Sequence, residues 1–192
     1  MTDERAAPPR RTALVSAAVV GVVMVTFIGL LATRDAGTSR GSTALIEQPA
    51  PVIQGETLDG VQFDLDDLRG RWVVVNFFAT WCPPCLVEHP ELVAFHEAHQ
   101  DTGDVEIVSV AFQDRVDKIE EFFEENGGEW PVLGEGVSSV AVNWGVTALP
   151  ESFLVSPQGV VVYKWIGASG VTLEGLESVL AQARGLTPEA PS

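Results

Sequence analysis

Two cysteines lie three positions apart near the middle of this 192-residue chain, and no other cysteine occurs in it. Cys82 and Cys85 stand in the stretch Trp81-Cys82-Pro83-Pro84-Cys85. Thiols at this spacing can share one helical turn and close a disulfide with each other, so that Cys85 can resolve a mixed disulfide formed at Cys82. The spacing therefore predicts a two-electron redox pair.

The flanking sequence predicts that Cys82 lies at the N-terminus of a helix. Residues 72–78 are almost all β-branched or aromatic, as in a strand buried on both faces, and apolar residues recur with helical spacing after Cys85. Unpaired amides and the macrodipole at a helix N-terminus favour the thiolate, which is the form that attacks disulfides. Pro83 and Pro84 fit a first turn, where a missing N–H costs little. We expect the Cys82 sulfur to be accessible there.

Two other interpretations of the cysteines are weaker. A structural disulfide that closes a four-residue loop constrains the unfolded chain very little. A metal site needs more ligands than two cysteines, because zinc normally takes four. His89, His96 and His99 follow on the same predicted helix, but histidines on a solvated helix usually bind nothing. We therefore predict neither a metal nor a cofactor.

The charge distribution argues against binding to nucleic acid or anionic lipid. The chain has a formal net charge of −16, and the 142 residues after residue 50 hold six Lys or Arg against 23 Asp or Glu. Such a surface repels polyanions. The length fits one compact domain with appendages.

The first 50 residues predict a membrane anchor and a tether. Residues 1–12 carry three arginines, and residues 13–32 contain no charge. A helix of the length of this uncharged segment spans roughly 30 Å, the thickness of the hydrocarbon core of a bilayer. The arginines predict a cytoplasmic N-terminus, a single-pass transmembrane helix at 13–32 and an extracytoplasmic remainder, where disulfides persist. Residues 33–50 are predicted to be a flexible linker. A cleaved signal peptide is the alternative, although the apolar run is longer than usual for one.

The remaining pattern predicts an α/β domain over residues 51–185, with a polar tail at 186–192. Asp59-Gly60 predicts an N-terminal hairpin, and Pro90 is expected to interrupt and kink the helix after the cysteines. Strands flanked by helices in this order form a mixed sheet covered on both faces. The other predicted elements are strands at 72–78, 105–111 and around 132, helices at 115–126 and 137–144, a hairpin of 152–156 with 160–165, and a last helix capped by Thr172 and ended by Gly185.

The chain resembles the thioredoxin superfamily. The motif at 81–85 between a buried strand and a proline-containing helix, and Pro150 before a late hairpin, carry the resemblance. Asn76 stands where thioredoxin has a buried acid, and Glu88 follows the second cysteine by one turn. Together with the N-terminal anchor, these features are similar to the membrane-anchored ResA, CcmG and TlpA group over about residues 50–185. The resemblance implies a thioredoxin-like fold with an N-terminal β-hairpin extension.

The resemblance also implies roles for individual residues. Cys82 is expected to attack and Cys85 to resolve. Pro150 is expected to be a cis-proline, and the backbone at Leu149 before it pairs with an extended substrate segment. Glu88 is expected to be an active-site acid that exchanges protons with the thiols, with a surface glutamate as the alternative.

Two further side chains and the activity complete the expectations. Trp81 is expected to cover the disulfide and contact substrate, unless it is core packing, and Glu151 to influence substrate choice, unless it is only solvated. The implied activity is reduction of protein disulfides, such as the Cys-x-x-Cys-His of an apocytochrome c before haem attachment. An integral-membrane thiol carrier is the implied electron donor. The alternatives are an exported disulfide oxidase and a copper-binding thioredoxin-like protein.

Overall fold

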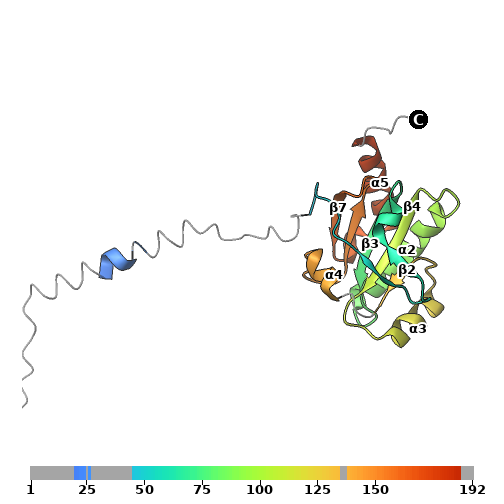
Figure 1. Cartoon of the computed structure of the whole chain (residues 1–192), viewed down its shortest axis with the longest axis horizontal. Helices are drawn as coiled ribbons and strands as arrows, with labels where there is room; N and C mark the ends of the chain where they lie inside the picture. Colours follow the sequence, from blue (N-terminus) through green and yellow to red (C-terminus); the bar gives the residue numbers. More distant parts are fainter. Residues whose placement is uncertain (1–19, 25, 27–44, 135–137, 187–192) are drawn as a thin grey trace, which may run out of the picture. The chain divides into compact units, whose positions relative to one another are not determined.

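The structure is a computed structural model that describes residues 20–24, 26, 45–134 and 138–186 (Figure 1). The chain divides into two units, Met1–Arg40 and Gly41–Ser192. In the first unit, the described residues are helical. Most of the predicted anchor at 13–32 lies outside the described residues. None of the helices in the described ranges combines the length and the apolar character that crossing a bilayer requires.

A five-stranded mixed sheet forms the centre of the second unit, in the order β5-β4-β3-β6-β7. The parallel strands β3, β4 and β5 lie side by side, and β6 runs antiparallel to both β3 and β7. The strands are β3 (Trp72–Phe78), β4 (Val105–Ala111), β5 (Val132–Leu133), β6 (Glu151–Val155) and β7 (Val161–Ile166). Because β3 is the middle strand and both its faces are covered, all seven of its residues are buried.

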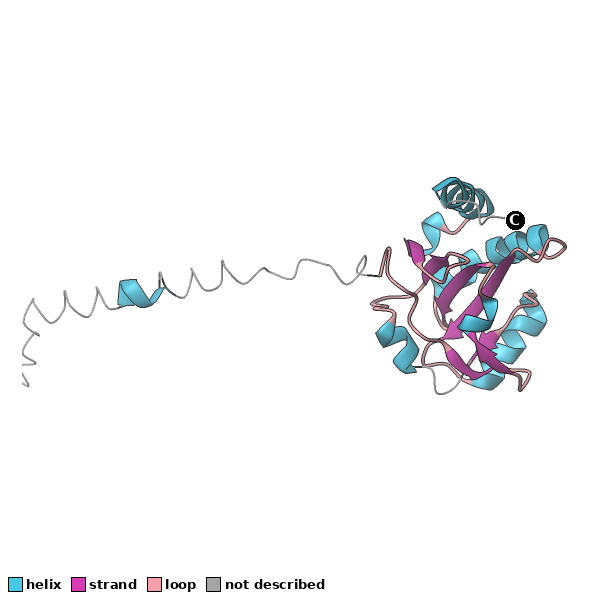
Figure 2. Ribbon diagram, turned by 45° about the horizontal axis from the view of Figure 1, so that its top comes forward, coloured by secondary structure: helices cyan, strands magenta, loops and turns pink. Residues whose placement is uncertain are grey.

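Helices cover both faces of this sheet, as Figure 2 shows, so the predicted α/β sandwich is confirmed. The longer helices are α2 (Pro83–His99), α3 (Val116–Asn126), α4 (Ser138–Asn143) and α5 (Leu173–Leu186), with 3-10 turns η1 (Leu65–Leu68) and η2 (Ala168–Gly170). One core packs α2, α3 and α5 against the face of β3 that carries Val74. The other core lies on the Val75 face and contains Trp144, just after α4.

The predicted N-terminal hairpin is present and covers one edge of the sheet. Strands β1 (Gln54–Glu56) and β2 (Gln62–Asp64) pair antiparallel around a turn in which Gly60 has φ 78°, a conformation that glycine adopts without strain. The Leu58 N–H donates to the Val132 carbonyl at 2.9 Å. The hairpin thereby satisfies backbone groups at the outer strand β5.

The other edge of the sheet corrects the predicted start of the domain. The Glu47 N–H donates to the Val161 carbonyl at 2.8 Å, and the Val161 N–H donates to the Gln48 carbonyl at 2.9 Å. Residues 45–50 therefore belong to the folded unit, because they satisfy the open backbone groups of the outer strand β7. The predicted linker boundary at Pro51 is too late, and residues 33–44 lie outside the described residues.

The helix after the cysteines runs through Pro90 without a break. The predicted interruption at Pro90 is wrong, since α2 continues through it to His99. Leu92 and Phe95, both beyond the proline, are buried in the core, and this packing outweighs the lost backbone hydrogen bond. The last helix likewise runs one residue past Gly185, its predicted end.

The cap of α5 yields a test of stability. The Thr172 hydroxyl accepts a hydrogen bond from the Gly175 N–H at 3.0 Å, as an N-cap residue does. We expect Thr172→Ala to lower the free energy of unfolding by about 1 kcal/mol in urea titrations. Thr172→Ser keeps the oxygen and should be close to the parent protein; equal losses in both variants would show that the cap is not the cause.

Candidate active site

The cysteine pair lies where strand β3 passes into helix α2. Cys82 is the N-cap of α2, with extended backbone (φ −97°, ψ 103°), and Cys85 lies in the first turn. The two residues are joined by a disulfide, and their Cα atoms are 5.3 Å apart. The predicted position at a helix start is therefore confirmed, with prolines in the first turn as expected.

The predicted accessibility of the Cys82 sulfur is wrong for this disulfide-bonded structure. Cys82 is 4% exposed and Cys85 is 3% exposed. Both belong to the core cluster on the Val74 face of the sheet, together with Ala79 and Leu92. A disulfide carries no charge and packs like other apolar groups, so the core encloses it on most sides. Only a few per cent of the surface of either cysteine is open to solvent.

Trp81 lies outside the core, so the core-packing alternative is wrong. Its side chain is 59% exposed, and its indole N–H donates to the Gln113 carbonyl at 3.2 Å. The neighbouring Thr80 N–H donates to the Asp114 carboxylate at 2.6 Å. The loop after β4 thereby holds the start of the cysteine motif. Gln113 and Asp114 were not anticipated from the sequence, where nothing distinguishes them from other loop residues.

Leu149 and Pro150 lie next to the strand that leads to the cysteines. The Leu149–Pro150 peptide bond is cis, as the resemblance implies. Glu151, the next residue, pairs in register with Phe77 of β3, so Pro150 lies opposite the end of the strand that enters the motif. Pro150 is buried and Leu149 is half-buried. A substrate role for either residue stays a prediction.

Glu88 is enclosed one helical turn after Cys85, so the surface-glutamate alternative is wrong. Glu88 is only 1% exposed, and its Oε1 accepts a hydrogen bond from the Asn76 amide at 2.7 Å. Its Oε2 has no hydrogen-bond partner among the described residues. Burial raises the pKa of Glu88 from 4.5 to about 7, although the Asn76 hydrogen bond lowers it in part. Glu88 can therefore gain and lose a proton near neutral pH.

A row of polar side chains crosses the sheet beneath Glu88. Ser109 and Ser152 flank Asn76 in register on the neighbouring strands, and all three are buried. The Asn76 amide donates to Ser152 Oγ at 3.0 Å, and the Ser109 hydroxyl donates to Asn76 Oδ1 at 3.4 Å. Trp130 Nε1 donates to Ser109 Oγ at 2.9 Å. Only Asn76 was anticipated from the sequence; a lone serine within an apolar strand was the signal for the others.

Glu151 lies on the opposite face of the sheet in a buried ion pair. Its Oε2 is 2.7 Å from the ammonium of Lys164, and the two side chains are 0% and 3% exposed, respectively. The Thr147 hydroxyl donates to Glu151 Oε1 at 3.0 Å. The solvated alternative is therefore wrong, and this geometry leaves no surface of Glu151 for direct substrate contact. The pair instead holds the segment 147–151, which contains the cis-proline.

His89 corrects the expectation of histidines on a solvated helix. It is 5% exposed, packs against the rings of Phe122, Phe123 and Trp130, and has Nε2 3.0 Å from the Gly127 carbonyl. Burial lowers its pKa, which favours the neutral ring. Within the described ranges, no three His, Cys, Asp or Glu side chains are close enough together to hold a metal ion.

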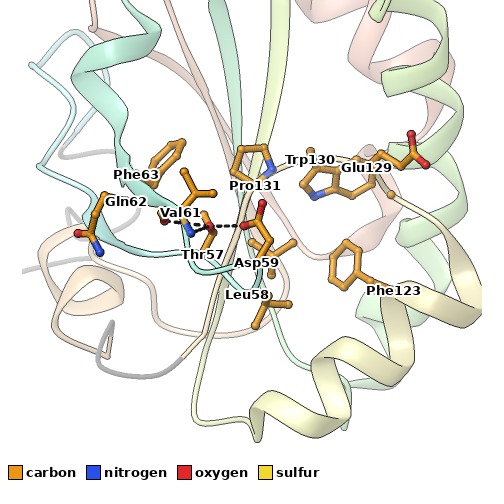
Figure 3. A pocket seen from close by; sticks show the side chains of 12 residues that line it. Thr57, Leu58, Asp59, Val61, Gln62, Phe63, Phe123, Glu129, Trp130 and Pro131 are labelled. Carbon is orange, nitrogen blue, oxygen red and sulfur yellow. Dashed lines mark hydrogen bonds between the residues drawn. The ribbon is translucent and has the colours of Figure 1, made fainter.

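A separate pocket of about 460 Å³ lies between the N-terminal hairpin and the segment before β5 (Figure 3). Its lining is mostly apolar and includes Leu58, Phe63 and Trp130. Neither cysteine lines it. Trp130 thus lines this pocket, and its indole N–H also donates to Ser109 in the polar row that ends at Glu88.

Comparison with known proteins assigns the family. The AhpC/TSA family matches residues 46–164, which is more than half of the chain. The chain belongs to the AhpC/TSA family. This AhpC/TSA chain is 32% identical over 151 residues to the thiol:disulfide interchange protein HelX of Rhodobacter capsulatus, covering 76% of the chain and 83% of HelX. It is 33% identical over 135 residues to the thiol-disulfide oxidoreductase ResA of Bacillus thuringiensis, and the match covers 70% of the chain and 76% of ResA.

Two further comparisons agree with this assignment. The thiol:disulfide interchange protein CycY of Rhizobium leguminosarum bv. viciae is 36% identical over 121 residues, which are 62% of the AhpC/TSA chain and 63% of CycY. A crystal structure of a thioredoxin-family thiol:disulfide interchange protein from Chlorobium tepidum TLS matches with a TM-score of 0.63 and 28% identity. The match covers 70% of the AhpC/TSA chain and 94% of the Chlorobium protein. The relatives are thiol-disulfide oxidoreductases, so the resemblance to the ResA and CcmG type is confirmed.

The buried ion pair at the cis-proline segment yields a second test. We expect Lys164→Met to lower the free energy of unfolding by about 3–5 kcal/mol, because it leaves the Glu151 carboxylate buried without a counter-charge. Urea titration measures this loss. The double variant Glu151→Gln/Lys164→Met should recover much of it; a double variant as unstable as Lys164→Met alone would contradict this account.

Glu88 yields a test in the pH dependence of stability. Between pH 4.5 and about 7 the unfolded chain loses the Glu88 proton while the folded protein keeps it. The free energy of unfolding therefore decreases as the pH rises through this window, by at most roughly 3 kcal/mol. Glu88→Gln removes this contribution, so its unfolding free energy in urea should decline less over the same window. Parallel pH profiles of the two proteins would contradict the raised pKa.

Proposed function

We propose that this protein is an extracytoplasmic thiol-disulfide oxidoreductase that reduces protein disulfides. The observation that carries the proposal is the Cys82–Cys85 disulfide at the start of α2, one turn before an enclosed carboxyl group with a pKa near neutrality. The relatives HelX, CycY and ResA support thiol-disulfide exchange as the chemistry.

The reduced protein acts in two exchange steps. The Cys82 thiolate attacks one sulfur of the substrate disulfide, which forms a mixed disulfide and releases the other substrate sulfur as a thiolate. The Cys85 thiol then loses its proton and attacks the Cys82 sulfur, which releases the second substrate thiolate. The substrate gains two electrons, and the protein is left with the Cys82–Cys85 disulfide seen in this structure.

Glu88 exchanges the proton in the second step. Its Oε1 is occupied by the Asn76 amide, whereas its Oε2 is free of hydrogen bonds to other described residues. Oε2 is therefore the atom that accepts the Cys85 proton as that thiol attacks. A base with a pKa near the working pH suits this step, because a large fraction is ionised and it still binds the proton.

The substrate lies along Leu149 and Pro150 with Trp81 beside it. Because only 4% of Cys82 is exposed, an extended chain can reach it more easily than a folded surface can. A segment that pairs with the backbone at Leu149, as in strand addition, brings its disulfide close to Cys82. The exposed indole of Trp81 provides an apolar contact for the segment.

Charge and the N-terminal sequence support the proposed direction of electron transfer and the proposed location. The acidic chain and the enclosed Glu88 disfavour a thiolate at the active site, which makes the pair less oxidising than one surrounded by cations. The uncharged segment 13–32 serves as a single-pass anchor that leaves the cysteines outside the cytoplasm. There the protein is recharged by an integral-membrane thiol carrier, and an apocytochrome c with a Cys-x-x-Cys-His disulfide is its substrate.

Trapping with Cys85→Ser in the native membrane tests this function. Without the resolving thiol, the mixed disulfide at Cys82 accumulates and survives non-reducing electrophoresis. We expect cytochrome c peptides and one membrane carrier among the adducts identified by mass spectrometry. The variant Cys82→Ser/Cys85→Ser is the matched control and should form no adduct.

Other outcomes would favour the rival functions. Adducts with many unrelated exported proteins, or a reduction potential near about −120 mV, would favour an oxidase. Stoichiometric Cu(I) binding by a protein that exchanges no disulfides would favour a copper-binding role.

A further inference from the structure

The active-site acid is connected to Trp130 by a continuous chain of buried hydrogen bonds. Trp130 Nε1 donates to Ser109 Oγ, the Ser109 hydroxyl donates to Asn76 Oδ1, and the Asn76 amide donates to Glu88 Oε1. Ser109 lies in β4, Asn76 in β3 and Glu88 in α2, and Trp130 lies in the loop before β5. Each of these residues is 6% exposed or less. Bulk water therefore does not compete for these groups. Which group donates and which accepts at each hydrogen bond is determined by the four side chains themselves.

The indole N–H determines the direction of the chain. An indole can donate a hydrogen bond but cannot accept one, so Ser109 must turn an oxygen lone pair toward Trp130. The Ser109 hydroxyl has a single proton, so it then donates its hydrogen bond to the side-chain oxygen of Asn76. That leaves the Asn76 –NH2 group toward Glu88 and Ser152.

We propose that Trp130 and Ser109 are positioning residues that hold the Asn76 amide as a donor to Glu88. An asparagine amide could otherwise turn over, because its two ends have the same shape and opposite hydrogen-bonding character. With its –NH2 group toward Glu88, Asn76 stabilises an unprotonated Oε1 and leaves Oε2 to carry the proton. The inference rests on the proposed role of Glu88 as the acid that serves Cys85.

Four other titratable residues of α2 and its N-cap lie within three positions of Glu88 or at the disulfide. Cys82 and Cys85 do not titrate while they form the disulfide, and the His89 ring packs toward α3. Glu91 accepts a hydrogen bond at its Oε2 from the Leu173 N–H at the start of α5. Among the described residues, strands β3, β4 and β6 present the neutral side chains of Asn76, Ser109 and Ser152 on this face. The charged pair of Glu151 and Lys164 lies on the other face of the sheet, where it packs with Phe153.

The experiment compares Trp130→Phe with Trp144→Phe. Both variants remove a buried indole N–H and keep an aromatic ring, but Trp144 Nε1 has no hydrogen-bond partner among the described residues and lies on the opposite face. Carbon-13 NMR of the Glu88 carboxyl in the oxidised protein measures its titration midpoint, with the signal assigned by its absence in Glu88→Gln. Melting temperatures establish that each variant is folded.

We expect the midpoint of Glu88 to rise by at least about half a pH unit in Trp130→Phe, because the donor to its carboxylate is no longer fixed. Ser109→Ala should shift it in the same direction, Ser109→Thr should retain the parent midpoint, and Trp144→Phe should leave it unchanged. An unchanged midpoint in folded Trp130→Phe and Ser109→Ala would overturn the inference, and so would an equal shift in Trp144→Phe.

A second measurement separates this inference from the proposed function. The rate at which dithiothreitol reduces the protein disulfide is recorded against pH for the parent, Glu88→Gln and Trp130→Phe. If Glu88→Gln keeps the parent pH profile, the proposed role of Glu88 fails whatever Trp130 does. If Glu88→Gln changes the profile and Trp130→Phe does not, the positioning inference alone fails. A profile displaced to higher pH in Trp130→Phe supports both.

Discussion

The hydrogen bond from Asn76 to Glu88 connects the centre of the sheet to the helix that carries the cysteines. It joins β3, which is buried along its whole length, to the second turn of α2, so the acid and the disulfide are held by the same two elements. A carboxyl group enclosed in an apolar core is unfavourable when ionised, and this one hydrogen bond offsets part of that penalty. The proton affinity of the site therefore depends on how rigidly the sheet presents one amide.

The two faces of the sheet treat a buried carboxyl group in opposite ways. On the α2 face Glu88 has neutral partners, so its proton is easily gained and lost. On the other face Glu151 Oε2 lies 2.7 Å from the ammonium of Lys164, and this buried ion pair fixes its position. The first arrangement suits proton exchange, and the second suits holding the segment of the cis-proline in place. The same residue type thus has neutral hydrogen-bond partners on one face of the sheet and a charged partner on the other.

Much of the fold and the centre of the candidate site could be predicted from the sequence, because their signals are local. The cysteine motif, the buried strand before it and the hairpin at Asp59-Gly60 each depend on residues within one short stretch. The partners could not be predicted, since Lys164, Ser109 and Trp130 reach the site only through strand pairing between distant segments. His89 was misjudged for the same reason, because the rings that enclose it come from α3 and the loop after it.

The enclosure of the disulfide has a consequence for how selectively electrons can enter the protein. A small dissolved thiol reaches a sulfur only through random collisions with the few per cent of surface that remains open. A thiol on a protein bound beside Trp81 would stay next to the disulfide for as long as the complex lasts, so its effective concentration there would greatly exceed that of free thiols in the medium. Burial of the disulfide therefore favours reaction with a thiol that is held beside it over reaction with thiols free in solution.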